Sequence, residues 1–233
     1  MKTGIQMSVG AAQYLMQYMR YLVLFIVLIG FSCARAGSYE DYFQALKIDD
    51  EATVSSLLQR GFDPNTLDPG GMHGLLVAAR ERSYKAATVL ARWPKTQVEV
   101  RTKADENPLM LAALHGQLEY ARLLVSRGAD VNKPGWTPLH YASTSGQVAI
   151  IQLLLDNHAY IDASSPNGTT PLMMAAFYGT PSAVKLLLEA GADPLLKNEQ
   201  ALTAIDFAHR NQRQESADII AAFVRAKQPR GKW

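Results

Sequence analysis

Small and large apolar residues recur along residues 39–227 with a period of 30 to 34 residues. The alanine of an L-x-x-A pattern, or of its variant, stands at Ala45, Ala78, Ala112, Ala142, Ala175 and Ala208. Twelve residues after each alanine comes a large aliphatic residue, namely Leu57, Leu90, Leu124, Leu154, Leu187 and Ile220. Sixteen residues after three of the alanines come Gly61, Gly128 and Gly191. Because three independent positions keep one period, the region is interpreted as about six copies of one unit.

Each unit predicts two short antiparallel helices. The sequence TPLH at 137–140, like TPLM at 170–173, places a capping threonine before a proline at the first helical position. Gly116, Gly146 and Gly179 are expected to end the first helix and turn the chain back. A second helix such as residues 147–157 carries a Leu/Ile stripe at helical spacing. Since one helix pair cannot bury this stripe alone, the units must stack into an all-α solenoid.

These motifs resemble the ankyrin repeat family, whose pattern is close to G-x-TPLHxAAxxG, a second helix with LL, and then GADxN. The resemblance covers about residues 39–227 and fades at both ends, where TAID at 203–206 and Gln212 replace the usual residues. It implies an ankyrin-repeat solenoid with short hairpin-like fingers between units and degenerate terminal units. We place the units near 39–66, 67–101, 102–131, 132–164, 165–197 and 198–227, within a repeat domain of residues 37–227.

Two departures from the pattern predict local irregularities. The unit of Ala78 has HGLL in place of TPLH and RWPKT at 92–96 in place of the GAD turn, so its second helix should end irregularly at Pro94. The link at residues 131–135 is three residues short of the family's hairpin. That finger should be stunted and leave a step in the row of turns.

The first 36 residues have the pattern of a signal peptide. Arg20 precedes an apolar run at 21–31, and an A-x-A arrangement ends at Ala36, where cleavage is expected. An uncleaved anchor is the alternative, although eleven helical residues span roughly 17 Å and the hydrocarbon core of a membrane about 30 Å. A lipid anchor on Cys33 is a third reading. The mature protein is expected to be periplasmic or secreted, with a basic tail at 228–233.

Charge and cysteine content exclude several classes of function. The chain has 23 Lys and Arg against 21 Asp and Glu, but Lys2, Arg20 and Arg35 precede residue 36. The remainder is close to neutral and lacks the cationic face that nucleic acid requires. The single cysteine of the chain, Cys33, lies in the N-terminal segment, which leaves no thiol for disulfides, zinc sites or catalysis in the repeats.

No motif indicates an enzyme. The five histidines lie in different units without metal-ligand spacing, and the resemblance implies that the ring of His140 bonds its own helix start. Asn167-Gly168-Thr169 matches a glycosylation sequon but also suits the turn of a finger, the interpretation we favour. We therefore predict no catalytic residue, metal or cofactor. The enzymatic alternative is a small hydrolase sited in the irregular second unit around Arg80, Glu81 and Trp93.

The resemblance implies that a partner protein meets the concave face, at the ends of the first helices and the finger tips. The helix-end residues are Arg80, Glu81, Leu114, His115, Thr144, Ser145, Phe177, Tyr178, Arg210 and Asn211, and the tip residues are Met72, Lys103, Glu106, Trp136, Asn167 and Thr169. Phe177 and Tyr178 cannot both face the core, because successive helical positions differ by about 100°.

The predicted function is therefore that of a monomeric, non-enzymatic binding module. The resemblance implies an exported bacterial ankyrin repeat protein whose partner is another protein, such as a co-transcribed periplasmic enzyme that it protects, regulates or inhibits. Contact with the membrane is expected only through the signal segment. A membrane-tethered scaffold that retains this segment is the alternative.

Overall fold

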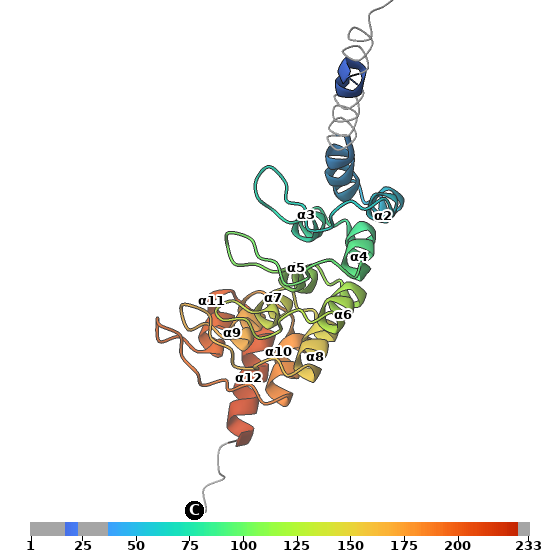
Figure 1. The fold of residues 1–233 in the computed structure, drawn as a ribbon. Helices are drawn as coiled ribbons and strands as arrows, with labels where there is room; N and C mark the ends of the chain where they lie inside the picture. The colour runs from blue at the N-terminus through green and yellow to red at the C-terminus, as the bar shows by residue number, and fades with distance from the viewer. Residues whose placement is uncertain (1–16, 23–36, 228–233) are drawn as a thin grey trace, which may run out of the picture.

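Pairs of short antiparallel helices stack on one another along the molecule (Figure 1). The computed structural model describes residues 17–22 and 37–227, and both 17–22 and 37–47 are helical. The named helices are α2 (Glu51–Gln59), α3 (Gly74–Arg80), α4 (Tyr84–Arg92), α5 (Pro108–Leu114), α6 (Leu118–Ser126), α7 (Pro138–Thr144), α8 (Val148–Asp156), α9 (Pro171–Phe177), α10 (Pro181–Glu189), α11 (Ala204–Arg210) and α12 (Gln214–Lys227). The predicted all-α solenoid is confirmed.

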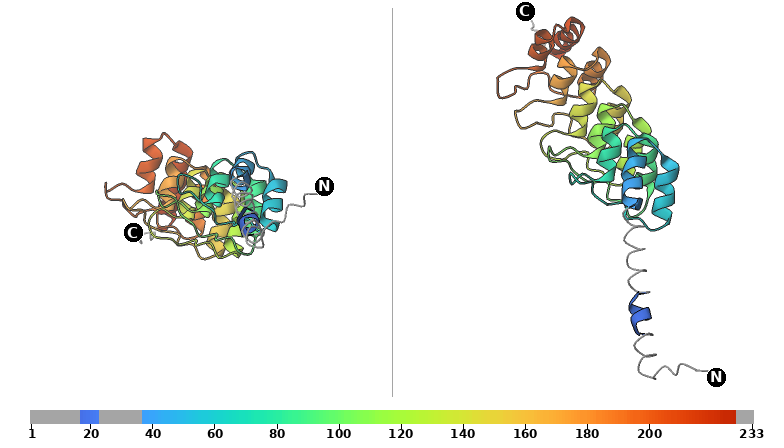
Figure 2. Two further views of the ribbon diagram at one scale, coloured as in Figure 1. Left: turned by 45° about the horizontal axis from the view of Figure 1, so that its top comes forward. Right: turned by 90° about the horizontal axis from the view of Figure 1, so that it is seen from above.

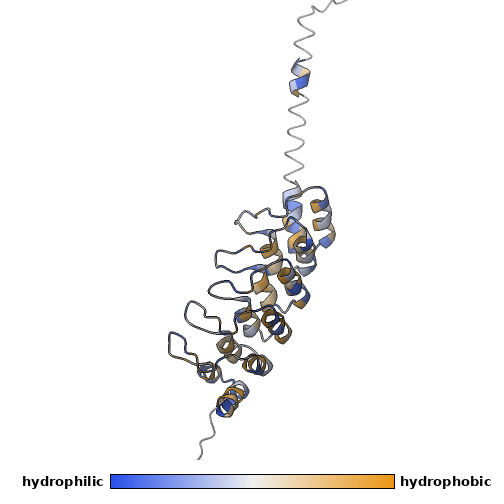
Figure 3. Ribbon diagram, turned by 60° about the horizontal axis from the view of Figure 1, so that its bottom comes forward, coloured by the Kyte–Doolittle hydropathy of each residue, from blue (hydrophilic) through white to orange (hydrophobic). Residues whose placement is uncertain are grey.

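The stack has three layers, formed by the loops between units, the first helices and the second helices. The loops, called fingers here, comprise residues 60–73, 93–107, 127–137, 157–170 and 190–203, and they project on the side of the first helices (Figure 2). Figure 3 shows that apolar residues concentrate on the helices. Among residues 17–22 and 37–227, no helix combines the length and apolarity needed to cross a membrane.

The periodic alanines and leucines form one continuous core. Each periodic alanine is at most 2% exposed, and each periodic leucine or isoleucine is at most 1% exposed. All of them belong to one cluster that runs from Tyr42 to Ile220. The core of each unit is therefore completed by its neighbours.

The TPLH histidine joins its own helix start to the next finger. His140 is fully buried, its Nδ1 lies 3.2 Å from the amide nitrogen of Thr137, and its Nε2 lies 2.9 Å from the carbonyl oxygen of Thr169. Burial lowers the pKa of His140 to about 4, so the ring is neutral at physiological pH. With Nδ1 accepting from Thr137, Nε2 carries the proton and donates to Thr169. The structural role expected for His140 is confirmed.

The glycines that follow the first helices do not all serve one purpose. Gly116 and Gly146 have φ of +71° and +66°, as a left-handed turn requires. Gly179 also follows the end of its helix, but its φ lies outside the left-handed region, so a left-handed turn does not explain why glycine is needed there. A Cβ at Gly179 would lie 2.4 Å from the carbonyl oxygen of Ser143. Glycine is required there because α9 ends against the backbone of α7.

The second unit ends irregularly, as its sequence predicts. Helix α4 stops at Arg92, and Trp93 is extended with φ −67° and ψ 128° ahead of Pro94. The carbonyl groups left open are bonded by the Arg127 guanidinium from the next unit, which donates to the carbonyl oxygens of Ala91 and Trp93. A side chain therefore performs the capping that a GAD turn performs elsewhere.

A ladder of side-chain acceptors links the bases of successive fingers. At one position in each of four successive fingers, a side-chain oxygen accepts the backbone N–H of a residue in the next finger. The bonds join Asn65 Oδ1 to Gln97 N (2.8 Å), Glu99 Oε2 to Asp130 N (3.1 Å), Asn132 Oδ1 to Tyr160 N (2.8 Å) and Asp162 Oδ1 to Asp193 N (3.1 Å). The equivalent residue in the next unit is Leu195, which is 63% exposed. The ladder was not foreseen from the sequence.

Core substitutions should lower the free energy of unfolding most in central units, which have a neighbouring unit on each side. Leu154→Ala or Leu187→Ala should lower the free energy of unfolding by about 2–5 kcal/mol, as large-to-small core changes do. Ile220→Ala should cost less, because α12 packs mainly on α10 and α11, on one side of the stack. Urea titration gives the three values. A larger loss for Ile220→Ala would contradict the assigned order of core and end unit.

Asp162→Asn should stabilise the protein at neutral pH. Partial burial raises the pKa of Asp162 and outweighs the hydrogen bond from the backbone N–H of Asp193, which lowers it, so the charged form is disfavoured in the folded state. Asparagine keeps the acceptor oxygen of the ladder, as Asn65 and Asn132 show at equivalent positions. Since the site is open to solvent, the gain should be no more than about 0.5 kcal/mol.

The gain from Asp162→Asn should shrink at acidic pH, where the wild-type carboxyl becomes protonated and no longer carries the disfavoured charge. Thermal unfolding at several pH values measures it. Asp156→Asn, on the exposed side of α8, is the control and should have little effect. A loss of stability in Asp162→Asn at pH 7 would show that the carboxylate charge strengthens the ladder.

Candidate functional site

The predicted helix-end residues occupy the same place in five successive units. In each unit, one of the two is the last residue of the first helix and the other is its C-cap. The first helices α3, α5, α7, α9 and α11 lie next to the fingers, so these pairs form a row along one side of the stack (Figure 1). We call this row, together with the finger tips, the finger face.

The α9 end of the finger face presents an exposed aromatic residue. Tyr178 is 55% exposed, whereas Phe177 is half-buried and packs against Phe207 with a centroid distance of 5.9 Å. The prediction that at least one of the two adjacent aromatics faces solvent is confirmed. The Arg213 guanidinium donates to the carbonyl oxygen of Tyr178, and the Asn211 amide donates to that of Phe177. The main chain that carries Tyr178 is thus held by the following unit.

The half of the finger face around α3 and α5 is polar and bonded to itself. Glu106 accepts from Arg80 Nη2 at 3.1 Å and from the Tyr141 hydroxyl at 3.3 Å, which connects three units. Burial, followed by the charge of Glu106, raises the pKa of Tyr141 to about 12. His115 Nδ1 lies 2.6 Å from the Tyr84 hydroxyl, and burial lowers the pKa of His115. The structure brings Arg80 and Glu106 together, a contact that the sequence did not predict.

Three of the predicted residues line a groove between the first two fingers. Met72, Arg80 and Lys103 surround a hollow of about 440 Å³. Arg101 also lines it, but its guanidinium bonds to Asp105 and Glu99. Two of the cations that line the groove, Arg80 and Arg101, are therefore already paired with carboxylates.

The residues of the hydrolase alternative are kept apart. Arg80 and Glu81 lie at the end of α3, which is followed by the start of α4, whereas Trp93 follows the far end of α4. A helix of nine residues separates these ends by about 13 Å. Arg80 is also engaged by Glu106. The geometry does not favour a shared reaction site for these residues.

The remaining predicted residues are held by local contacts. Thr144 Oγ1 donates to the carbonyl oxygen of His140, and Ser145 Oγ donates to that of Tyr141. Leu114 is half-buried, and Arg210 Nη1 donates to the side chain of Gln200.

Asn167 lies in the finger turn that we favoured over glycosylation. Its Oδ1 accepts from Ser165 Oγ at 2.6 Å, and Gly168 has a left-handed φ of +75°. The amide oxygen of Asn167 also accepts from the backbone of Thr169 at 3.3 Å. The side chain is thus part of the turn itself.

The third finger is stunted, as its sequence predicts. It comprises residues 127–137, three fewer than the next finger at 157–170. Trp136 at its tip is half-buried, and its ring packs on His140 in a T-shaped arrangement with a centroid distance of 5.2 Å. Lys133, whose side chain is 1% exposed, supports this finger and was not foreseen from the sequence. A lysine directly before a shortened Pro-Gly turn is the available sequence signal.

A family model described as ankyrin repeats (3 copies) matches residues 43–134, 75–165, 131–198 and 157–227. The nuclear factor NF-kappa-B p105 subunit of Mus musculus is 34% identical over 153 residues, which cover 63% of this chain and 16% of that protein. The neurogenic locus notch homolog protein 1 of Xenopus tropicalis is 28% identical over 176 residues, covering 68% and 7%. The B-cell lymphoma 3 protein homolog of Mus musculus is 32% identical over 152 residues, covering 62% and 34%. The matched region spans a minor part of each relative.

Proposed function

Because this chain belongs to the ankyrin repeat family, whose repeats bind other proteins, we propose that it is an exported, non-enzymatic module that holds its partner on the finger face. The partner is a protein, and a co-transcribed periplasmic enzyme that is protected, regulated or inhibited by the complex is the specific candidate. The module acts as a monomer in this proposal.

The exposed Tyr178 is the observation that carries the proposed binding face. It presents a large aromatic surface to solvent while its main chain is bonded to the following unit. Aromatic side chains held in this way are typical of the few residues that dominate binding energy at interfaces. Trp136 adds a second aromatic on the same side of the stack, at the tip of the third finger.

Export is proposed from the N-terminal sequence. Apart from Tyr21 and Leu22, the apolar run at 21–31, together with Cys33 and the cleavage position at Ala36, lies outside the described residues. The support is the pattern itself, a cation, a short apolar run and small residues before the cut. A tethered scaffold that keeps this segment would present the same finger face.

Tyr178→Ala should weaken partner binding at least about tenfold, which corresponds to about 1.4 kcal/mol. Its thermal midpoint should stay nearly unchanged, because the ring is mostly exposed. Trp136→Ala should weaken binding similarly. It should also lower the thermal midpoint somewhat, because the ring of Trp136 packs on His140. Calorimetric titration of the partner, purified by pull-down from the periplasmic fraction, measures both.

Lys185→Glu is the control for these variants. Lys185 is exposed on α10, in the layer of second helices, and pairs only loosely with Glu189 at 3.8 Å. The affinity of the Lys185→Glu variant for the partner should match that of the wild-type protein. Wild-type affinity in both aromatic variants would rule out the finger face around them as the binding surface.

The exported protein should begin at Gly37. Cleavage after Ala36 removes the apolar run and Cys33 together. Intact-mass spectrometry of the protein from a periplasmic extract tests this expectation. A mass that retains Cys33, with or without a lipid, would instead support the anchored forms.

A further inference from the structure

Four of the five fingers close their tips with the same backbone bond. In each, a backbone N–H donates to the carbonyl oxygen of the fourth residue along. The bonds run from Asp68 to Met72 (2.8 Å), from Thr102 to Glu106 (2.9 Å), from Ser165 to Thr169 (3.0 Å) and from Asn198 to Leu202 (3.0 Å). The acceptor residue directly precedes the N-cap of the next first helix.

In the stunted third finger, a lysine ammonium takes the place of this donor. The equivalent acceptor is the carbonyl oxygen of Trp136, and Lys133 Nζ donates to it at 2.8 Å. The N–H of Asn132, which would be the equivalent donor, bonds instead to Asp130 Oδ1. Lys133 Nζ also donates to the carbonyl oxygen of Pro134 at 2.9 Å.

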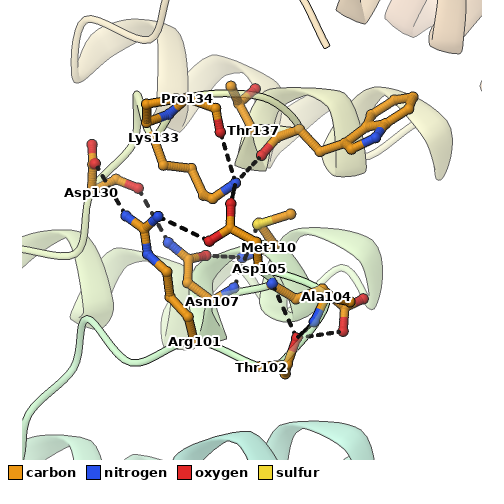
Figure 4. Close-up of polar contacts among 12 residues, drawn as sticks. Arg101, Thr102, Ala104, Asp105, Asn107, Met110, Asp130, Lys133, Pro134 and Thr137 are labelled. Carbon is orange, nitrogen blue, oxygen red and sulfur yellow. Dashed lines mark hydrogen bonds and ion pairs between the residues drawn. The ribbon is translucent and has the colours of Figure 1, made fainter. Parts of the chain in front are cut away.

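The same ammonium ties the third finger to the second. Its remaining contact is Asp105 Oδ2 at 2.6 Å, and Arg101 Nη1 holds the other oxygen of that carboxylate at 3.0 Å (Figure 4). Hydrogen bonds from Lys133 and Arg101 lower the pKa of Asp105. An ammonium has three donors, so all of them are used. This full satisfaction explains how a lysine can be buried here, since a buried charge is tolerated only with well-placed partners.

We propose that Lys133 is a positioning residue for partner binding, which holds the main chain of Trp136 and locks the second and third fingers into one surface. The inference rests on the proposed function, because it assigns Trp136 to the interface. Holding Trp136 in place before the partner arrives reduces the ordering cost of binding. The short finger has no backbone donor at this point, so the ammonium alone bonds the carbonyl group of Trp136.

The first test measures tryptophan quenching and amide hydrogen exchange in the free protein, without a partner. With Trp93→Phe and Trp233→Phe as background, Trp136 is the only tryptophan. Lys133→Met should raise the acrylamide quenching constant of Trp136 about twofold at temperatures well below unfolding, because the finger opens locally. Amide hydrogen exchange should quicken in both 102–106 and 133–137. Lys185→Met, the same change on the exposed face of α10, should alter neither quantity.

Asp105→Asn separates the two roles of Lys133, which are holding the main chain of Trp136 and linking the second finger to the third. It also replaces Lys133→Met as the test variant if that variant does not fold. It keeps the bonds from Lys133 to the carbonyl groups of Pro134 and Trp136 but weakens the tie between fingers. Exchange should then quicken in 102–106, with a smaller rise in Trp136 quenching. Folded variants with wild-type quenching and exchange would overturn the proposal.

The second test measures affinity for the partner identified by pull-down. Lys133→Met should weaken binding about tenfold, which is the expected effect of losing a pre-ordered anchor. If Tyr178→Ala weakens binding and Lys133→Met does not, the positioning role is wrong while the proposed function stands. If Trp136→Ala and Tyr178→Ala both bind normally, the finger face around them is not the binding surface, and the positioning role of Lys133 in partner binding fails with it.

Discussion

The repeat helices of this protein depend on their neighbours, because the first helices α3, α5, α7, α9 and α11 have seven residues each and most second helices have nine. Helices this short are not stable alone in water. Burial of the second-helix leucines by adjacent units supplies the missing stability. The finger-base ladder adds a polar contact across each of four junctions, so that backbone groups between the stacked units keep hydrogen-bond partners.

Features that repeat in the sequence could be predicted, whereas features created by contact between units could not. The period located the buried alanines and leucines, and the shortened link located the stunted finger. Gly179 shows the limit, because its spacing suggested a local turn but its cause is the backbone of α7. The ladder was missed because Asn65, Glu99 and Asp162 share only an acceptor oxygen and a position, not a residue type.

The candidate site also combines features that the sequence predicts with features that arise only from contact between units. Motif spacing was sufficient to locate the helix ends, but the exposure of each side chain depends on the neighbouring units. Phe177 is partly covered by Phe207, and His115 is bonded to Tyr84 of the preceding unit. Lys133 was missed because lysine is normally a solvated surface residue, and only the neighbouring Asp105 and the open carbonyl groups make its burial possible.

Energetic differences along the finger face indicate where a partner would gain most. Around α3 to α7, Arg80, Glu106 and Tyr141 already satisfy one another, so a partner would have to replace these contacts. Replacing one solvent-accessible ion pair by another adds little to the free energy of binding. Tyr178 exposes a large surface to water, and a partner that covers this surface does not have to replace an ion pair. Because burying that surface requires only a complementary apolar group, we expect the strongest contacts of a partner on the finger face near the end of α9.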